Sequence, residues 1–215
     1  RPIATSADGS IAIDAARYEQ ELERYLQRHP IERLRFVMNG DRLNEYMSTQ
    51  LPEVVSVDVG GFGGFGASTF DIAVRKPLVS WMIGSTQYFV DANGVPFEKN
   101  YYETPAVRII DQSGAPQTSG TAIASTRFLN FVGRTVSLTS GQGLKVEQAV
   151  IPQGTTRQIE LRIEGHDYPI KLSLDRPVGE QVEDMKNTIE YFSSRNIIPE
   201  YVDIRVSGKA FYKTK

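Results

Sequence analysis

The sequence predicts an α+β protein in which a small unit of helices on a short sheet is followed by a mostly antiparallel β domain with two helices packed on it. Three observations predict this class. The length of 215 residues fits one large or two small domains. Four segments repeat apolar residues at spacings of three and four, the period of a helix, and the remaining ordered segments alternate with the period of a strand.

The first two predicted helices lie near the start of the chain. Asp14 is a helix-capping residue, and an apolar stripe follows from Ala15 to Arg28, ended by Pro30. Asp41 caps a second, shorter helix that runs to Gln50. Before these helices, the run Ser10 to Ile13 alternates and is the one candidate for an opening strand.

The strands of the first half follow the second helix. The run Gly60 to Gly66 is rich in glycine, but a phosphate-binding loop needs a helix directly after it, and the next residues alternate like a strand. It is therefore predicted as a hairpin connection. The predicted extended segments are Val54 to Val59, Thr69 to Val74, Leu78 to Ile83 and Gln87 to Val90.

The second half is dominated by strands. Its two predicted helices are Ala122 to Leu138 and Val178 to Ser194. Residues alternate between apolar and polar from Gln158 to Ile163, which predicts an antiparallel sheet with one face in water. The other predicted extended segments are Ala106 to Ile110, Leu144 to Ile151, Tyr168 to Leu174, Tyr201 to Val206 and Ala210 to Tyr212.

Composition excludes several classes of function. The chain has 24 Lys and Arg against 26 Asp and Glu, which argues against a nucleic-acid binder that works through bulk positive charge. With no Cys, zinc ribbons, iron–sulfur clusters and thiol nucleophiles are excluded. Two His residues make a multi-histidine metal site improbable. We therefore expect no metal, no cofactor and no nucleic-acid partner.

The residues give little support to catalysis. No G-x-S-x-G elbow is present, and His29 and His166 both lie in predicted turns. A wall-processing enzyme with two convergent carboxylates remains an alternative, but no spacing singles out a pair. Carboxylates that fall near a turn or a strand end include Asp91, Glu98, Glu103, Asp175 and Asp203. We expect a non-enzyme without catalytic residues or a small-molecule substrate.

The end of the chain is the most informative segment. Residues Tyr201 to Lys213 are rich in β-formers and contain no Pro. A final strand often lies at a sheet edge, where its unpaired amides can accept a partner strand. The alternative is an interior strand. Lysines such as Lys209, Lys213 and Lys215 are also used to protect an edge from aggregation, so the pattern leaves both interpretations open.

Three stretches in order resemble the extracytoplasmic part of the bacterial cell-division proteins FtsQ and DivIB. Leu43 to Trp81 is similar to the second half of a POTRA domain, with Leu51-Pro52-Glu53-Val54 and Val74-Arg75-Lys76-Pro77 followed by Trp81. Tyr88 to Phe97 is similar to the hairpin that opens the family's β domain. Glu180 to Arg205, followed by Tyr212-Lys213, is similar to the family's closing helix and strand.

The resemblance implies two domains, a POTRA domain over residues 1–82 and a β domain over residues 83–215. It also implies a single-pass membrane protein, with this region on the extracytoplasmic side of the cell membrane at the division septum. The anchoring membrane segment would precede Arg1 and be absent from this chain. The alternative to a division protein is a POTRA-containing assembly or translocation factor that binds client strands.

The resemblance further implies a non-catalytic scaffold of the divisome, acting in septation. It would bind FtsL-like and FtsB- or DivIC-like proteins and so link early and late division components with septal peptidoglycan synthesis. The helix Asp41 to Gln50 and the strand Val54 to Val59 would add recruitment contacts. On this view, lysine at Phe211 or proline at Ser207 should abolish binding. The partner strand would add to the last strand at Val206, Ser207, Gly208, Lys209, Ala210, Phe211 and Tyr212.

Overall fold

The computed structural model describes residues 1–34, 37–62, 66–115 and 122–214. The chain divides into two compact units. The first comprises Arg1–Pro77 and Val95–Thr104, and the second comprises Leu78–Gly94 and Pro105–Lys215. No helix in the described part is both long and apolar enough to cross a bilayer.

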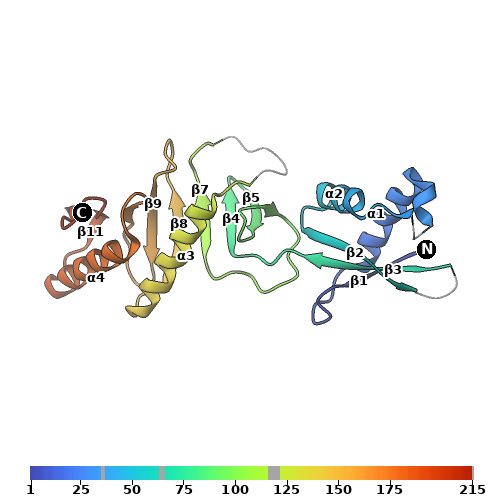
Figure 1. Cartoon of the computed structure of the whole chain (residues 1–215). Helices are drawn as coiled ribbons and strands as arrows, with labels where there is room; N and C mark the ends of the chain where they lie inside the picture. Colours follow the sequence, from blue (N-terminus) through green and yellow to red (C-terminus); the bar gives the residue numbers. More distant parts are fainter. Residues whose placement is uncertain (35–36, 63–65, 116–121, 215) are drawn as a thin grey trace. The chain divides into compact units, whose positions relative to one another are not determined.

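The first unit packs two helices on one face of a three-stranded sheet (Figure 1). The strand order is β1-β3-β2, with β1 parallel to β3 and β2 antiparallel to it. Its elements are β1 (Pro2–Ser6), α1 (Ala15–Arg28), the 3₁₀ helix η1 (Pro30–Arg33), α2 (Gly40–Gln50), β2 (Val54–Phe62) and β3 (Ser68–Val74).

The opening strand does not lie at the alternating run Ser10–Ile13, where the sequence predicted it. Ser10–Ile13 lies outside any strand, and β1 is formed by Pro2–Ser6 instead. This segment pairs with β3 from Pro2 opposite Ser68 to Ser6 opposite Ile72 and buries Ala4. The prediction was wrong because a parallel edge strand is set by pairing with a distant partner, and a short local alternation carries no information about that partner.

Buried glutamates of the first unit are paired with tyrosines and arginines. Three glutamates that are nearly inaccessible to solvent each lie beside a tyrosine hydroxyl and an arginine. The Tyr46 hydroxyl lies 2.5 Å from Glu21, the Tyr25 hydroxyl 2.6 Å from Glu32 and the Tyr18 hydroxyl 3.4 Å from Glu53. The arginine partner is Arg24 for Glu21, Arg42 for Glu32 and Arg17 for Glu53. These partners compensate the carboxylates for the loss of water.

The second unit contains most of a nine-stranded sheet. The strand order is β12-β11-β10-β9-β8-β7-β4-β5-β6, with β4–β7, β7–β8 and β10–β11 parallel. Strands β8, β9 and β10 are antiparallel neighbours, as the alternation predicts. The strands are β4 (Val79–Ile83), β5 (Thr86–Val90), β6 (Pro96–Phe97), β7 (Arg108–Asp111), β8 (Val146–Ile151), β9 (Gln158–Ile163), β10 (Ile170–Ser173), β11 (Pro199–Asp203) and β12 (Phe211–Thr214).

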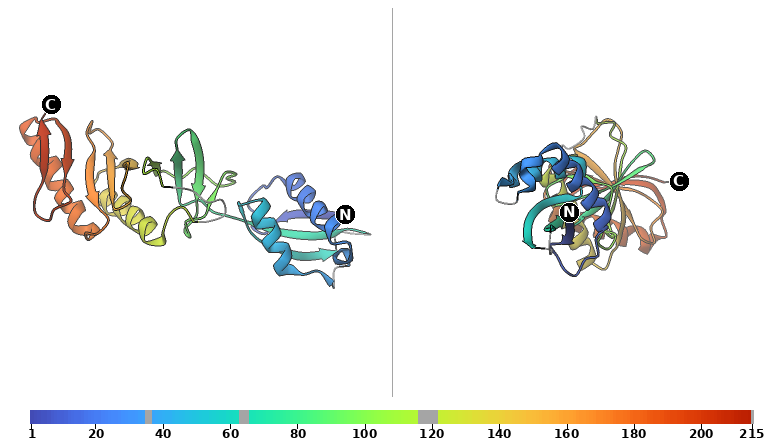
Figure 2. Two further views of the ribbon diagram at one scale, coloured as in Figure 1. Left: turned by 90° about the horizontal axis from the view of Figure 1, so that it is seen from above. Right: turned by 90° about the vertical axis from the view of Figure 1, so that its right-hand side faces the viewer.

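Two helices, α3 (Thr126–Gly141) and α4 (Val178–Arg195), lie against one face of this sheet (Figures 1 and 2). Their apolar stripes, including Phe128, Val132, Met185 and Phe192, are buried in the same core as the inward residues of the strands. The predicted α+β class, with helices on a short sheet and a mostly antiparallel sheet carrying two helices, is confirmed.

Helix α3 begins four residues later than predicted. Ser125 caps it, because its Oγ accepts a hydrogen bond of 3.1 Å from the Phe128 amide. In the glycine-rich run Gly60–Gly66, β2 continues to Phe62, and residues 63–65 lie outside the described part. Residues 116–121, which include most of the predicted loop Gly114–Gly120, also lie outside it.

Candidate partner-binding edge

Strand β12 ends the large sheet. It pairs with β11 on one side, and in the strand order no described strand lies on the other. All four residues, Phe211–Thr214, are exposed. In an antiparallel pair about half of the backbone N–H and C=O groups point away from the partner strand, so β12 presents such groups along its outer side.

The seven residues predicted for partner binding fall into two groups. Phe211 and Tyr212 lie in β12, whereas Val206–Ala210 form the turn that precedes it. The turn is closed by a hydrogen bond of 3.2 Å from the Lys209 amide to the Val206 carbonyl. Gly208 has a φ of 66°, a left-handed conformation that favours glycine. The strand itself continues to Lys213 and Thr214, which the prediction did not include.

The aromatic residues of β12 face opposite sides of the sheet. Tyr212 lies opposite Val202 in β11. Its ring packs edge-on against the buried Phe192 ring of α4, with 4.9 Å between the ring centroids. Phe211 lies opposite Asp203, on the face away from the helices, and is 52% exposed. A strand added to β12 would therefore meet an aromatic side chain on each face.

Two arginines hold the backbone and side chains directly after β11, before the turn Val206–Ala210 begins. Arg176 donates hydrogen bonds to the Ile204 carbonyl at 2.5 Å and to Asp184 at 3.0 Å. Arg205 donates to Asp203 at 2.6 and 2.9 Å, and this hydrogen bonding holds the pKa of the Asp203 carboxyl below its usual value. The sequence analysis missed Arg176, because it acts on a carbonyl 28 residues away.

Lys213 is paired rather than free. Its ammonium lies 2.6 Å from the Glu200 carboxylate, and the hydrogen bond with Glu200 raises the pKa of Lys213. Both side chains are largely exposed, so this pair adds little to stability. A charged side chain at this position is typical of an edge protected against unspecific pairing.

The outer side of β2 in the first unit is occupied. The Asn44 side chain of α2 accepts a hydrogen bond of 2.5 Å from the Val57 amide and donates one of 3.3 Å to the Val57 carbonyl. Helix α2 and strand β2, which the sequence analysis proposed as a recruitment surface, thus lie next to each other. At Val57, however, the outward backbone groups are already satisfied by a side chain.

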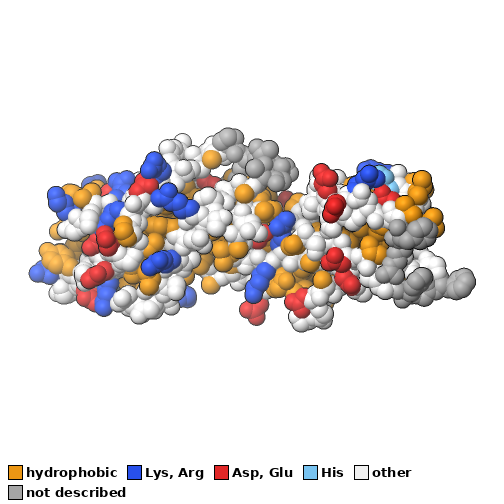
Figure 3. Space-filling view, viewed as in Figure 1, with side chains coloured by type: hydrophobic (Ala, Val, Ile, Leu, Met, Phe, Trp, Pro, Cys, Tyr) orange, Lys and Arg blue, Asp and Glu red, His pale blue; other side chains and the backbone are white. Residues whose placement is uncertain are grey.

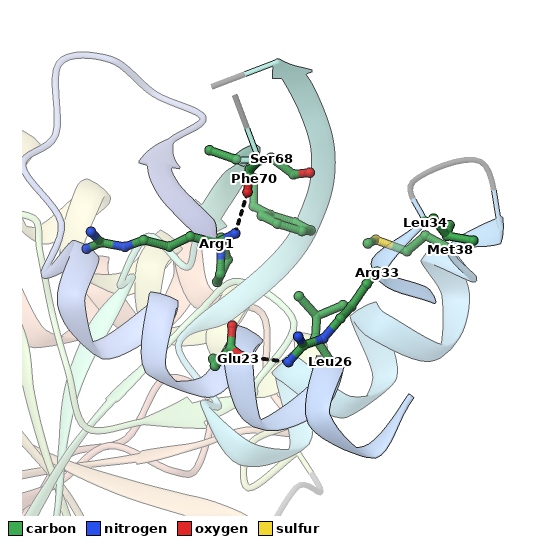
Figure 4. A pocket seen from close by; sticks show the side chains of 11 residues that line it. Arg1, Glu23, Leu26, Arg33, Leu34, Met38, Ser68 and Phe70 are labelled. Atoms are coloured by element: carbon green, nitrogen blue, oxygen red, sulfur yellow. Dashed lines mark hydrogen bonds and ion pairs between the residues drawn. The ribbon is translucent and has the colours of Figure 1, made fainter. Parts of the chain in front are cut away.

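Hollows in the described part hold few reactive groups. One hollow, of about 660 Å³ in the first unit, has Leu26, Met38 and Phe70 in its wall, and its one carboxylate, Glu23, is bonded to Arg33 at 2.8 Å (Figure 4). Its lining residues are Arg1, Pro2, Glu23, Leu26, Arg33, Leu34, Met38, Gly66, Ala67, Ser68 and Phe70.

A smaller hollow of about 360 Å³ in the second unit brings two carboxylates into one wall, Asp111 and Asp175. Asp111 accepts hydrogen bonds from Ser113 and from the Trp81 indole. The hydrogen bonds from Arg157 lower the pKa of Asp175, which is the opposite of what a general acid requires. This pair gives the wall-processing alternative no support.

The two histidines are far apart in the chain, with His29 at the end of α1 and His166 in the turn after β9. Among the described residues no group of three or more His, Asp or Glu side chains is placed to hold a metal ion. Searches against protein-family models and against curated proteins found no match for this chain.

Proposed function

We propose that this chain is the extracytoplasmic region of a cell-division scaffold of the FtsQ/DivIB type, membrane-anchored by a segment outside these 215 residues. Its role would be to bind FtsB- or DivIC-like and FtsL-like partners at the septum. It would thereby link early and late divisome components without catalysing a reaction. The three-part sequence resemblance, in the order POTRA-like unit and then β domain, supports this assignment.

One observation carries the proposal. Strand β12 is the terminal strand of the large sheet and is exposed at every residue. An extended peptide that adds to such an edge gains main-chain hydrogen bonds, and alternate side chains provide specificity. Phe211 and Tyr212 offer apolar contacts on the two faces of the sheet.

The comparison of edges favours β12 over β2 as the acceptor. Asn44 engages Val57 on the outer side of β2, so a client strand there would have to displace two hydrogen bonds. No described side chain is hydrogen-bonded to the backbone of β12 in this way. This difference supports the division scaffold over an assembly factor that captures client strands through its POTRA-like unit.

The test uses binding of the extracytoplasmic segment of the FtsB- or DivIC-like protein from the same organism. Phe211→Lys and Lys213→Pro should weaken binding by more than about tenfold, because the first removes an apolar contact and the second disrupts the strand. Ser207→Pro is the matched control. Ser207 lies in the turn rather than the strand, at the position before Gly208 that proline favours, so the expectation that proline there abolishes binding is revised.

Variants of the 215-residue chain would be compared by titration calorimetry, with circular dichroism to verify the fold. Wild-type affinity in both Phe211→Lys and Lys213→Pro would contradict strand addition at β12. Loss of binding in Ser207→Pro alone would place the contact in the turn instead.

A further inference from the structure

An exposed apolar ridge stands at the junction of α1 and α2 in the first unit. Ile31, Leu34 and Val37 are 68%, 53% and 43% exposed. Figure 3 shows apolar side chains gathered at this end of the unit, beside Arg, Lys and His side chains. Scattered apolar residues are normal on a surface, but three aliphatic side chains together form a contact feature.

Two backbone hydrogen bonds connect the residues of this ridge. The Leu34 amide donates to the Ile31 carbonyl at 3.0 Å, and the Val37 amide donates to the Leu34 carbonyl at 2.8 Å. Ile31 belongs to the 3₁₀ helix η1, whereas Leu34 follows that helix in an extended conformation, with a ψ of 105°.

Arginines surround the ridge. The described arginines near the ridge are Arg24, Arg28, Arg33 and Arg42, and the carboxylates near it are Glu32, Asp41 and Glu23, of which Glu23 pairs with Arg33 at 2.8 Å. Arg28, His29 and Arg42 line a hollow beside Ile31 and Val37, and Arg33 lines another beside Leu34 (Figure 4). Arg28 has no carboxylate partner among the described residues, and its guanidinium lies 5.8 Å from the Tyr46 ring centroid.

In two ion pairs near the ridge, the arginine is exposed to solvent and the carboxylate is buried, so the positive charge lies at the surface. In the Arg42–Glu32 pair the Glu32 side chain is 8% exposed and the Arg42 side chain 54% exposed. The Arg24–Glu21 pair has the same arrangement, with 54% exposure for Arg24 and 9% for Glu21. Each pair presents its cation to solvent and keeps its anion inside.

We propose that the ridge Ile31, Leu34 and Val37, with Arg28, Arg33 and Arg42 around it, binds an anionic lipid surface. Aliphatic side chains enter the boundary between headgroups and acyl chains, and arginines bind the phosphates. Charge complementarity favours lipid, because a projecting aliphatic ridge ringed by cations matches a surface of phosphates above hydrocarbon. This inference is independent of the binding edge at β12.

The test is cosedimentation of the full 215-residue chain with vesicles of phosphatidylglycerol and phosphatidylcholine in equal parts, or of phosphatidylcholine alone. Binding is expected to the anionic vesicles and to fall with added salt. Arg28→Ala should lower the partition coefficient by about fivefold, the effect of one cation near an anionic surface. Ile31→Ser with Leu34→Ser should lower it on the order of tenfold by removing apolar burial.

Ile198→Ser is the matched control, since Ile198 is 57% exposed in the second unit. It should leave vesicle binding unchanged, while the ridge variants should retain partner binding at β12. Failure of the wild-type chain to bind anionic vesicles, or equal losses in Ile198→Ser and the ridge variants, would overturn the proposal. Binding of a protein through the ridge without vesicle binding would also overturn it.

Discussion

Glu32 illustrates how a buried charge is held in the first unit. Its carboxylate accepts hydrogen bonds from the Tyr25 hydroxyl at 2.6 Å, the Asn39 amide at 3.2 Å and Arg42 at 2.9 Å. Burial acts to raise the pKa of this carboxyl, but the hydrogen bonds from Tyr25 and Asn39 and the charge of Arg42 outweigh it, so the pKa lies below the usual value. Ionised Glu32 therefore stabilises the fold above the pKa of an unfolded glutamate, about 4.3.

We predict that Glu32→Gln lowers the free energy of unfolding at pH 7 by about 2 kcal/mol, because charged hydrogen bonds to a buried group are lost. The wild-type chain should lose the contribution of Glu32 as the pH falls from about 5 through the lowered pKa, and the variant should show a smaller loss over that range. Urea unfolding at several pH values measures both effects.

Glu23→Gln provides the control for that measurement. Glu23 pairs with Arg33 at 2.8 Å, but both side chains are well exposed, so the change should cost under about 1 kcal/mol. If Glu23→Gln and Glu32→Gln destabilise equally, the buried network does not have the role described.

Among the elements, α2 packs on β2 through the apolar core and also bonds its backbone through the Asn44 side chain. Asn44 satisfies both backbone groups of Val57, a residue that is 2% exposed. This contact closes the middle of an edge that is nine residues long. Long open edges pair with other chains, so Asn44 has a protective role in addition to a stabilising one.

We predict that Asn44→Ala lowers the free energy of unfolding by about 1–3 kcal/mol and makes the chain associate at high concentration. Ser48→Ala on the same helix is the control, since Ser48 bonds only the carbonyl of Glu45 among the described residues. Sedimentation equilibrium with chemical unfolding would measure both quantities. A monomeric Asn44→Ala variant of unchanged stability would contradict this account of β2.

The elements also show what the sequence can predict. Helix α1 has the predicted bounds, because a capping Asp14, an apolar stripe and Pro30 are all local signals. Strand β9 also has the predicted bounds, because the alternation of apolar and polar residues from Gln158 to Ile163 is likewise a local signal. Strand β1 was misplaced because its position depends on pairing with β3, whose residues lie 66 positions further along the chain.

The binding edge was predictable only in part. The alternating final segment pointed to β12, but the turn at Val206–Ala210 depends on Gly208, and the Ile204 carbonyl before that turn is bonded by the distant Arg176. The closed edge of β2 was not predictable at all, since an Asn in a helix gives no indication that it bonds a strand. Contacts between elements, rather than the elements themselves, account for these gaps.

At the scale of the whole molecule, the chain enters the first unit twice. Val95–Thr104 belongs to that unit although Leu78–Gly94, which precedes it, belongs to the second. The returning segment is held at Tyr101, whose hydroxyl lies 3.1 Å from that of Tyr18 and accepts a hydrogen bond of 3.4 Å from the Asp14 amide. Lys99 adds an exposed ion pair with Asp14 at 3.5 Å.

We predict that Tyr101→Phe destabilises the first unit by about 1 kcal/mol, since the Tyr18 hydroxyl loses a partner, and leaves the second unit unchanged. Hydrogen exchange resolved along the chain can separate the two units. Tyr102→Phe should have a smaller effect, because no hydrogen bond of its hydroxyl is recorded among the described residues. Equal changes in both units would contradict the assignment of Val95–Thr104 to the first.

The most direct test of the central claim is amide hydrogen exchange in the full chain while the FtsB- or DivIC-like segment is titrated in. Strand addition at β12 predicts saturable binding, with new protection at the outward amides of Phe211–Thr214 and little change in β2. Protection confined to the first unit, or no binding at about millimolar partner, a concentration that captures even weak complexes, would contradict it.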